Sequence, residues 1–433
     1  MRKRTRMSAS LAAACTVLGA VALTVSASLP AQAAPTARAD YAPGPNDVVG
    51  DGSDTLQYLL DFGADGDPSG DAGYNSVGNP YKLVSMDATA DSNARYSWAN
   101  GSTLNNPLPL NPTAVYRAGT YPQQRINGSG AGINALLADT SASDPYIDFA
   151  RMSSNPTTQQ GATAVSNGWQ GLQDFVVGVE HLREAAATPT TNAPAGLSPQ
   201  ELVQIYQANQ PNCVKWNQLS GAPGGASTDA IIPIIPQSGS GTRSTFLADL
   251  ANEGNGGTAI VLGSCVSIGE ENDPVAITSL ASTTTDPNGG TCSPNCSADA
   301  IEPFSGARLN LWAGKSGNTS FGPNPSGGGY IHDPTTPYPG GAALNPGIVQ
   351  LTGTPTDGNS VYNDTRNLNV VYRWTDQISS TPWQPGGTLN WAQSLFCDPG
   401  GPTPFFQTAA GKTLIAEAGA DPSTQSCLSS PLT

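Results

Sequence analysis

The chain has 433 residues, of which 49 are glycine, 37 are proline and only 12% are charged, and its formal net charge is −15. This composition excludes a helical bundle, and the acidic surface disfavours nucleic acids and anionic membranes as partners. About 400 residues also exceed the size of one ordinary core, so we expect two domains.

Residues 1–33 have the organisation of a secretory signal peptide. Four basic residues within the first six positions precede an apolar stretch, and Ala31-Gln32-Ala33 has the small-x-small pattern of a cleavage site. We predict cleavage after Ala33, which leaves 14 basic and 33 acidic residues and a formal charge of −19. The alternatives are a membrane anchor and a lipoprotein cut before Cys15. No later apolar run reaches the roughly 18 residues that span a bilayer, which predicts a secreted protein without membrane insertion.

Six cysteines follow the predicted signal peptide, at Cys213, Cys265, Cys292, Cys296, Cys397 and Cys427. An even number in an oxidising compartment predicts three disulfide bonds, and six cysteines allow 15 pairings. Cys292 and Cys296 could close a small loop, and Cys397 with Cys427 would tie down the C-terminal segment. Zinc is disfavoured because neither histidine, His181 or His332, is near a cysteine pair in the sequence. We predict no metal site and no cofactor.

The first part of the chain contains predicted strands that run into small-residue loops. Residues 47–49 enter Gly50-Asp51-Gly52-Ser53-Asp54-Thr55, after which leucines recur at helical spacing. Beyond a loop-like stretch to about residue 112, a second helix is predicted after Asn127-Gly128-Ser129-Gly130-Ala131-Gly132. Residues 147–150 form a predicted buried strand that ends at Arg151-Met152-Ser153-Ser154, and residues 175–179 are a short apolar run.

The second part repeats this alternation. Ser198-Pro199-Gln200-Glu201 predicts a capped helix start, and a strand over 230–235 leads into Gln237-Ser238-Gly239-Ser240-Gly241-Thr242 and another helix. The Gly/Pro/Asn-rich stretch 313–364 is predicted to be a surface insertion. A strand over 369–374 and a helix over 412–418 follow. Strands that alternate with helices indicate an α/β fold with largely parallel sheets.

Three of these loops share one physical design, namely Gly52–Thr55, Gly128–Gly130 and Ser238–Thr242. Each offers free N–H donors and hydroxyl groups at a helix N-terminus, and glycine lets a ligand approach the backbone closely. In open α/β sheets such loops gather at the carboxyl ends of the strands. Together they predict a site for a tetrahedral oxyanion. For any one loop alone, a simple helix cap is the favoured interpretation.

The same stretches also resemble a known family. Residues 231–246 look like a strand, a Ser-Gly-Thr anion loop and the following helix, and residues 197–219 are similar to a helix and a Trp-Asn turn. Residues 126–132 and 148–154 occupy the expected earlier places. In this order and spacing, the stretches resemble the phosphate-binding proteins of bacterial phosphate ABC transporters. The resemblance spans roughly Asp47 to Asn252.

The resemblance implies a two-lobed, periplasmic-binding-protein-like (type II) α/β fold with a cleft between the lobes and long loop insertions. Lobe 1 would combine residues 45–174 with 300–433, including the 313–364 insertion, and lobe 2 would be residues 175–299. The two lobes would close around the bound anion by a hinge motion.

The resemblance also implies particular ligands for the anion. They are Ser53, Thr55, Ser129, Gly130, Arg151, Ser153, Ser240, Gly241, Thr242 and Arg243. The chain departs from the family at two places, because Pro236-Gln237 stand where an arginine is usual and Ser153-Ser154 stand where an aspartate accepts the proton of phosphate. Arg151, Arg243 or Arg125 could restore positive charge, and an ion pair is the alternative role of Arg151.

These observations predict a monomeric, extracellular solute-binding protein that captures phosphate or a similar oxyanion for an ABC permease and is not an enzyme. The alternative is a secreted protein of the same fold that binds another anion or a carbohydrate without a transporter. A secreted serine hydrolase is less favoured, because Ser129 and Ser240 lack the Gly-x-Ser-x-Gly frame of a nucleophile elbow. No catalytic residue is predicted.

Overall fold

The computed structural model describes residues 42–67, 71–86, 88, 113–140, 146–312, 320–321, 341–342, 347–425 and 427–433. These residues belong to one compact unit that runs from Arg38 to Thr433. The predicted signal peptide with its cleavage site, most of the predicted 313–364 insertion and His332 lie outside the described residues.

The main sheet has the strand order β2-β1-β5-β13-β6-β9-β7-β8, and β12 and β14 also pair with β6. The bounds are β1 Val48–Gly52, β2 Leu83–Ser85, β5 Phe149–Met152, β6 Leu172–Ala187, β7 Ile232–Pro236, β8 Ser267–Gly269, β9 Ala300–Ser305, β12 Ile348–Gln350, β13 Asp364–Arg373 and β14 Asp421–Pro422. Within it, β1 runs parallel to β2 and β5, and β7 runs parallel to β8 and β9. Two short antiparallel pairs stand apart, β3 (Thr113–Ala114) with β4 (Gln123–Gln124) and β10 (Ser320–Phe321) with β11 (Gly341–Ala342).

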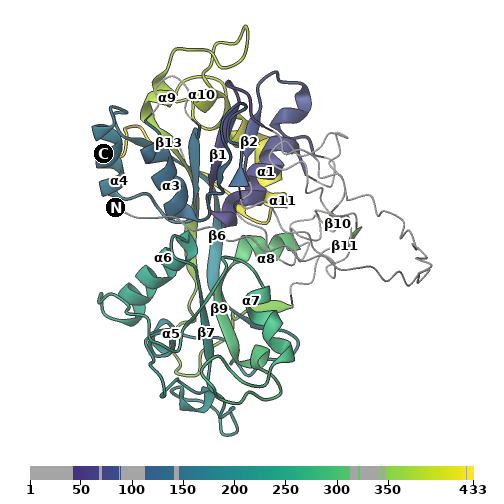
Figure 1. Cartoon of the computed structure of the whole chain (residues 1–433), viewed down its shortest axis with the longest axis vertical. Helices are drawn as coiled ribbons and strands as arrows, with labels where there is room; N and C mark the ends of the chain where they lie inside the picture. Colours follow the sequence, from purple (N-terminus) through teal and green to yellow (C-terminus); the bar gives the residue numbers. More distant parts are fainter. Residues whose placement is uncertain are drawn as a thin grey trace, which may run out of the picture. The chain divides into compact units, whose positions relative to one another are not determined.

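Strand β6 links the two parallel groups. It pairs with β13 from Leu172 to Leu182 and with β9 from Leu182 to Ala186, and Figure 1 shows it running from one group into the other. The sequence predicted only a short apolar run over 175–179, and this expectation was too short. The strand continues for 16 residues, and half-buried side chains alternate with buried ones from Val179 to Glu184. The apolar run ends early because two of these buried residues, Glu180 and Glu184, are charged.

The helices are α1 Gln57–Asp65, α3 Ser129–Ala138, α4 Thr158–Ser166, α5 Pro199–Tyr206, α6 Gly241–Asp249, α7 Val275–Thr278, α8 Gly306–Trp312, α9 Trp374–Ile378, α10 Trp391–Leu395 and α11 Ala409–Glu417. The predicted helix start at Ser198 is confirmed, because Ser198 and Glu201 form a reciprocal capping box. The predicted α/β class is confirmed, because helices and strands alternate along most of the chain. The expectation of a largely parallel sheet is wrong, because β6 and β13 pair antiparallel with each other and with their other neighbours.

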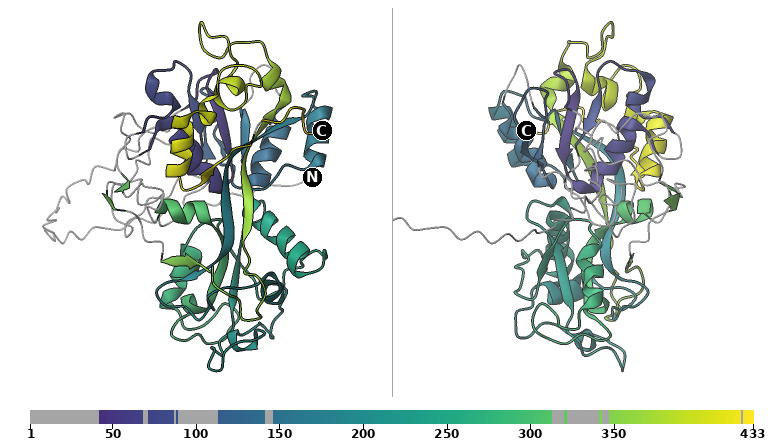
Figure 2. Two further views of the ribbon diagram at one scale, coloured as in Figure 1. Left: turned by 180° about the vertical axis from the view of Figure 1, so that it is seen from behind. Right: turned by 45° about the vertical axis from the view of Figure 1, so that its right-hand side comes forward.

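Helices cover both faces of the first group of strands. Successive residues of β13 show this, since Val370 and Tyr372 pack in a cluster with α1 and α11, whereas Val371 packs in a cluster with α3. Figures 1 and 2 show these helices on opposite sides of the sheet. A third apolar cluster joins α5 and α6 to β7, through side chains such as Phe246. This layered arrangement places the carboxyl ends of β1, β5 and β7 toward the loops described below.

Three disulfide bonds stabilise the fold. The two pairings suggested by the sequence, Cys292–Cys296 and Cys397–Cys427, are confirmed, and the third is Cys213–Cys265. Trp383 and Trp391 pack in the core, where Trp383 stacks on Tyr74. No helix among the described residues is both long and apolar enough to cross a bilayer.

The end of the predicted insertion contributes to the core. Of its described residues, Ile348, Leu351 and Tyr362 are buried, and β12 pairs with β6. The expectation of a purely surface segment is therefore wrong for residues 347–363. Their buried side chains are separated by glycines and polar residues, which hides any periodic pattern in the sequence.

Candidate functional site

The three predicted anion loops meet in the structure. The backbone N–H of Gly130, at the start of α3, donates to the carbonyl oxygen of Gly239 (2.9 Å), so the loops before α3 and α6 pack directly on each other. A side chain at Gly241 would overlap the hydroxyl groups of Ser129 and Ser153. Glycine is needed at position 241 because the two loops approach this closely.

Five buried hydroxyl residues gather at this junction, and we call them the hydroxyl cluster: Ser53, Thr55, Ser129, Ser153 and Thr242. Ser53 Oγ donates to Ser153 Oγ (2.9 Å), and the N–H of Ser153 donates to Ser129 Oγ (2.9 Å). The cluster thus joins the ends of β1 and β5 to the first turns of α3 and α6. All five residues were predicted as anion ligands from the sequence.

A carboxylate that the sequence analysis missed lies in the middle of the hydroxyl cluster. Glu271 follows β8, and its Oε1 accepts hydrogen bonds from Thr242 Oγ1 (2.7 Å), Thr55 Oγ1 (3.0 Å), Ser153 Oγ (3.4 Å) and the N–H of Thr242 (3.4 Å). Glu271 is fully buried, and its Oε2 has no hydrogen-bond partner among the described residues. One oxygen of a carboxylate is therefore held by donors from three loops.

A guanidinium group lies on the other side of Thr242. Arg366 of β13 donates from Nη2 to Thr242 Oγ1 (2.9 Å) and forms a buried ion pair with Glu180 of β6 (2.5 Å). Its Nη1 is buried and has no partner among the described residues. No local pattern pointed to Arg366, because it follows the predicted insertion and lies outside the family resemblance.

The other predicted positive charges are engaged elsewhere. The Arg151 guanidinium is fully buried, pairs with Asp51 (3.1 Å) and donates to Ser85, which is the ion-pair role that the sequence allowed. Arg243 is half-buried and donates from Nη1 to the carbonyl oxygen of Pro236 (3.1 Å). The roles of Arg151 and Arg243 as anion ligands stay predictions.

Ser240 acts as a helix cap. Its Oγ accepts a hydrogen bond from the N–H of Arg243 (3.1 Å), which satisfies one of the free donors at the start of α6. Ser53 caps its own turn in the same way, through the N–H of Thr55 (3.3 Å). The cap interpretation that the sequence favoured for single loops is thus confirmed for these two hydroxyls, although Ser53 also joins the hydroxyl cluster.

The residues on either side of Glu271 connect it to the neighbouring loops. Glu270 accepts hydrogen bonds from Asn127 Nδ2 (2.7 Å) and Gln237 Nε2 (3.0 Å). Burial raises the pKa of Glu270 to about 7, and the negative charges of nearby carboxylates add to the shift. Asn272 has a left-handed backbone (φ 56°) and donates from Nδ2 to Thr55 Oγ1 (3.0 Å). The segment 270–272 thus contacts all three anion loops.

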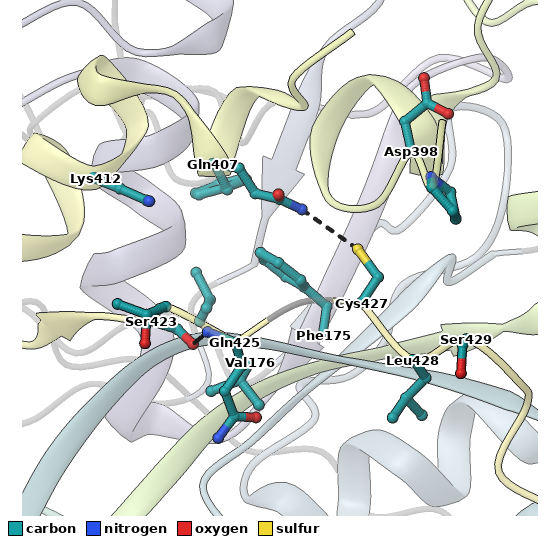
Figure 3. A pocket seen from close by; sticks show the side chains of 14 residues that line it. Phe175, Val176, Asp398, Gln407, Lys412, Ser423, Gln425, Cys427, Leu428 and Ser429 are labelled. Atoms are coloured by element: carbon teal, nitrogen blue, oxygen red, sulfur yellow. Dashed lines mark hydrogen bonds between the residues drawn. The ribbon is translucent and has the colours of Figure 1, made fainter. Parts of the chain in front are cut away.

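A cavity of about 350 Å³ lies in a different part of the fold, between the start of β6, α11 and the C-terminal segment. Figure 3 shows Lys412, Gln407 and Cys427 in its wall, where Gln407 Nε2 donates to Cys427 Sγ (3.4 Å). None of the hydroxyl cluster lines this cavity. The cavity and the predicted anion site are therefore separate features.

Residues 110–307 match the model of the PBP superfamily domain. The matched stretch is 198 residues long, a little under half of the 433-residue chain. The match covers the loops before α3 and α6 and Glu271, and with it the two-lobed, periplasmic-binding-protein-like fold implied by the resemblance is confirmed. No curated protein matches the sequence significantly.

Solved structures that match this chain share little sequence identity with it. One is a putative phosphate ABC transporter substrate-binding protein from Clostridium perfringens, with 10% identity, a TM-score of 0.46 and coverage of 87% of this chain and 100% of that one. Another is an ABC-type phosphate transport receptor from Vibrio cholerae, with 12% identity, a TM-score of 0.44 and the same coverage.

Proposed function

We propose that the protein is an exported solute-binding protein whose hydroxyl cluster holds a small oxyanion, with phosphate as the solute, for delivery to an ABC permease. In this proposal it binds its solute without chemical conversion. Residues 45–174 with 300–433 form one lobe and residues 175–299 the other, and export follows from the predicted signal peptide.

One observation carries this proposal: four donors from three separate loops converge on a single carboxylate oxygen, Oε1 of Glu271. A carboxylate is itself an oxyanion, so these donors are already arranged to hold an anionic oxygen. Ordinary helix caps would satisfy their own first turns and would not point to one shared acceptor.

The electrostatic surroundings support an anion at this place despite the negative net charge. The N–H of Thr242 lies at the start of the nine-residue helix α6, where the helix dipole favours negative charge. Arg366 adds a buried guanidinium beside the Thr242 hydroxyl group. Local donors therefore decide which ligand fits, because long-range surface charge is screened in salt.

Calorimetric titration of the mature chain, residues 34–433, tests the proposal. We expect saturable binding of one phosphate per chain, and sulfate and arsenate test the choice among oxyanions. Heat from a sugar panel without heat from any oxyanion would support the carbohydrate alternative. Turnover of ester substrates would support a hydrolase. Absence of binding to every oxyanion would exclude the proposed function.

A further inference from the structure

We propose that Glu271 is an internal occupant of the hydroxyl cluster, which the solute must displace in order to bind. This inference rests on the proposed function, since it concerns the same donors. It assigns to Glu271 a role in setting the affinity of the site: the chain supplies its own competing anion.

The count of hydrogen atoms supports displacement. A hydroxyl group carries one hydrogen, so it donates to one acceptor at a time. Thr55 and Thr242 both direct theirs to Glu271 Oε1, at 3.0 Å and 2.7 Å. The same two hydroxyls cannot be donated to an external anion while Glu271 holds them.

The space and the charge at the site also disfavour joint occupancy. The loops around the hydroxyl cluster are packed so closely that a Cβ at Gly241 would overlap two hydroxyl groups. Two anions side by side in a buried site repel each other strongly, because little water screens them. An external oxyanion and the Glu271 carboxylate therefore compete for one position.

The carboxylate of Glu271 is also an imperfect ligand. Only Oε1 is held, whereas Oε2 is buried without a partner among the described residues. Leaving a buried oxygen without a hydrogen bond has a free-energy cost, so the state in which Glu271 occupies the cluster is less stable and an external anion can replace it more easily. A free tetrahedral anion can direct its oxygens to more donors, including Arg366 Nη1, which has no partner among the described residues.

Displacement would also release the contact between segment 270–272 and the loop after β1. Asn272 holds Thr55 through its side chain and accepts a hydrogen bond from the N–H of Ser305 (3.1 Å), while the N–H of Glu271 donates to Gln237 (2.9 Å). Glu271 and Asn272 thus connect the loop after β1 to the segments that follow β7 and β8.

The test compares phosphate affinity in the wild type and in Glu271→Gln, Glu271→Ala and Glu270→Gln. Measured at a pH of about 8.5, where most Glu270 side chains are ionised, Glu270→Gln is the matched control. It removes one negative charge from the residue beside Glu271, and the Glu270 side chain is held by Asn127 and Gln237 instead of by the hydroxyl cluster. We expect both Glu271 variants to bind phosphate at least tenfold more tightly than the wild type, and the control to change affinity by no more than about threefold. Thermal melts of all four proteins verify folding.

A second readout uses a small external carboxylate. Formate should bind Glu271→Ala and compete there with phosphate, because it can enter the vacated position, and it should leave the wild type unaffected. If both Glu271 variants bind phosphate with the same affinity as the wild type or more weakly, the inference is overturned and the proposed function stays intact. Equal tightening in Glu270→Gln would also overturn it, as a general charge effect. No phosphate binding by any of the four proteins would remove both proposals.

Discussion

The hydroxyl cluster and the carboxyl groups of Glu184 and Glu302 are both buried, yet their polar atoms are satisfied very differently. In the cluster, hydroxyls and a backbone N–H from three loops meet one carboxylate oxygen. On β6 and β9, Glu184 receives one hydrogen bond, from Tyr206 (2.7 Å), and neither oxygen of Glu302 has a partner among the described residues.

The comparison shows that donors, not burial alone, separate a site for an anion from a place that disfavours charge. Burial raises the pKa of Glu184 to about 8, and burial followed by the charges of neighbouring carboxylates raises the pKa of Glu302 well above its ordinary value. The strands that carry Glu184 and Glu302 have their N–H groups engaged in the sheet. The hydroxyl cluster lies at helix starts, where free N–H groups remain.

The largest effect should come from removing the guanidinium beside the cluster. Arg366→Met leaves Glu180 buried without its cation, and we expect the free energy of unfolding to fall by about 3–5 kcal/mol. Urea unfolding measures this change. The double variant Glu180→Gln/Arg366→Met should recover much of the loss, and a single-variant loss below about 1 kcal/mol would mean that the ion pair is dispensable.

The second prediction concerns the dependence of stability on pH. The folded state keeps a proton on Glu184 that the unfolded chain releases above its ordinary pKa of 4.5, so stability falls as the pH rises from about 4.5 to about 8. Glu184→Gln removes the contribution of this proton to the pH dependence. The free energy of unfolding of the variant, relative to that of the wild type, should therefore increase from pH 4.5 to pH 8, by on the order of a few kcal/mol at pH 8. Identical pH profiles of the two proteins would show that Glu184 is ionised in the fold.

A smaller effect is expected for single hydroxyls of the cluster. Ser129→Ala and Thr242→Val each remove a buried hydroxyl group that we propose as a ligand of the anion, so each should weaken phosphate binding by about 1 kcal/mol or more. Ser244→Ala is the control, because Ser244 lies exposed on the same helix α6 and donates to the carbonyl oxygen of Ser240. If calorimetry finds the wild-type phosphate affinity in all three variants, the anion binds outside the cluster.

Local features of the fold and site could be predicted well from the sequence. The capping box of Ser198 and Glu201 and the strands that enter the anion loops both depend on residues a few positions apart. Helix starts are set by hydrogen bonds within one turn, so a short stretch of sequence contains the information. Four of the five hydroxyl residues of the cluster lie in loops that were found in this way, and Ser153 was assigned through the family resemblance.

Only the tertiary structure decided which charged groups lie against the hydroxyl cluster. Glu271 and Thr55 are 216 positions apart, and Arg366 and Thr242 are 124 apart, so no local pattern connects them. The full length of β6 was likewise hidden, because its second half buries the charged residues Glu180 and Glu184, which a pattern of apolar residues does not reveal. By itself the sequence determined where free N–H and hydroxyl donors stand, whereas the fold determined which acceptor they hold, since a buried carboxylate takes its partners from whichever strands and loops pack around it.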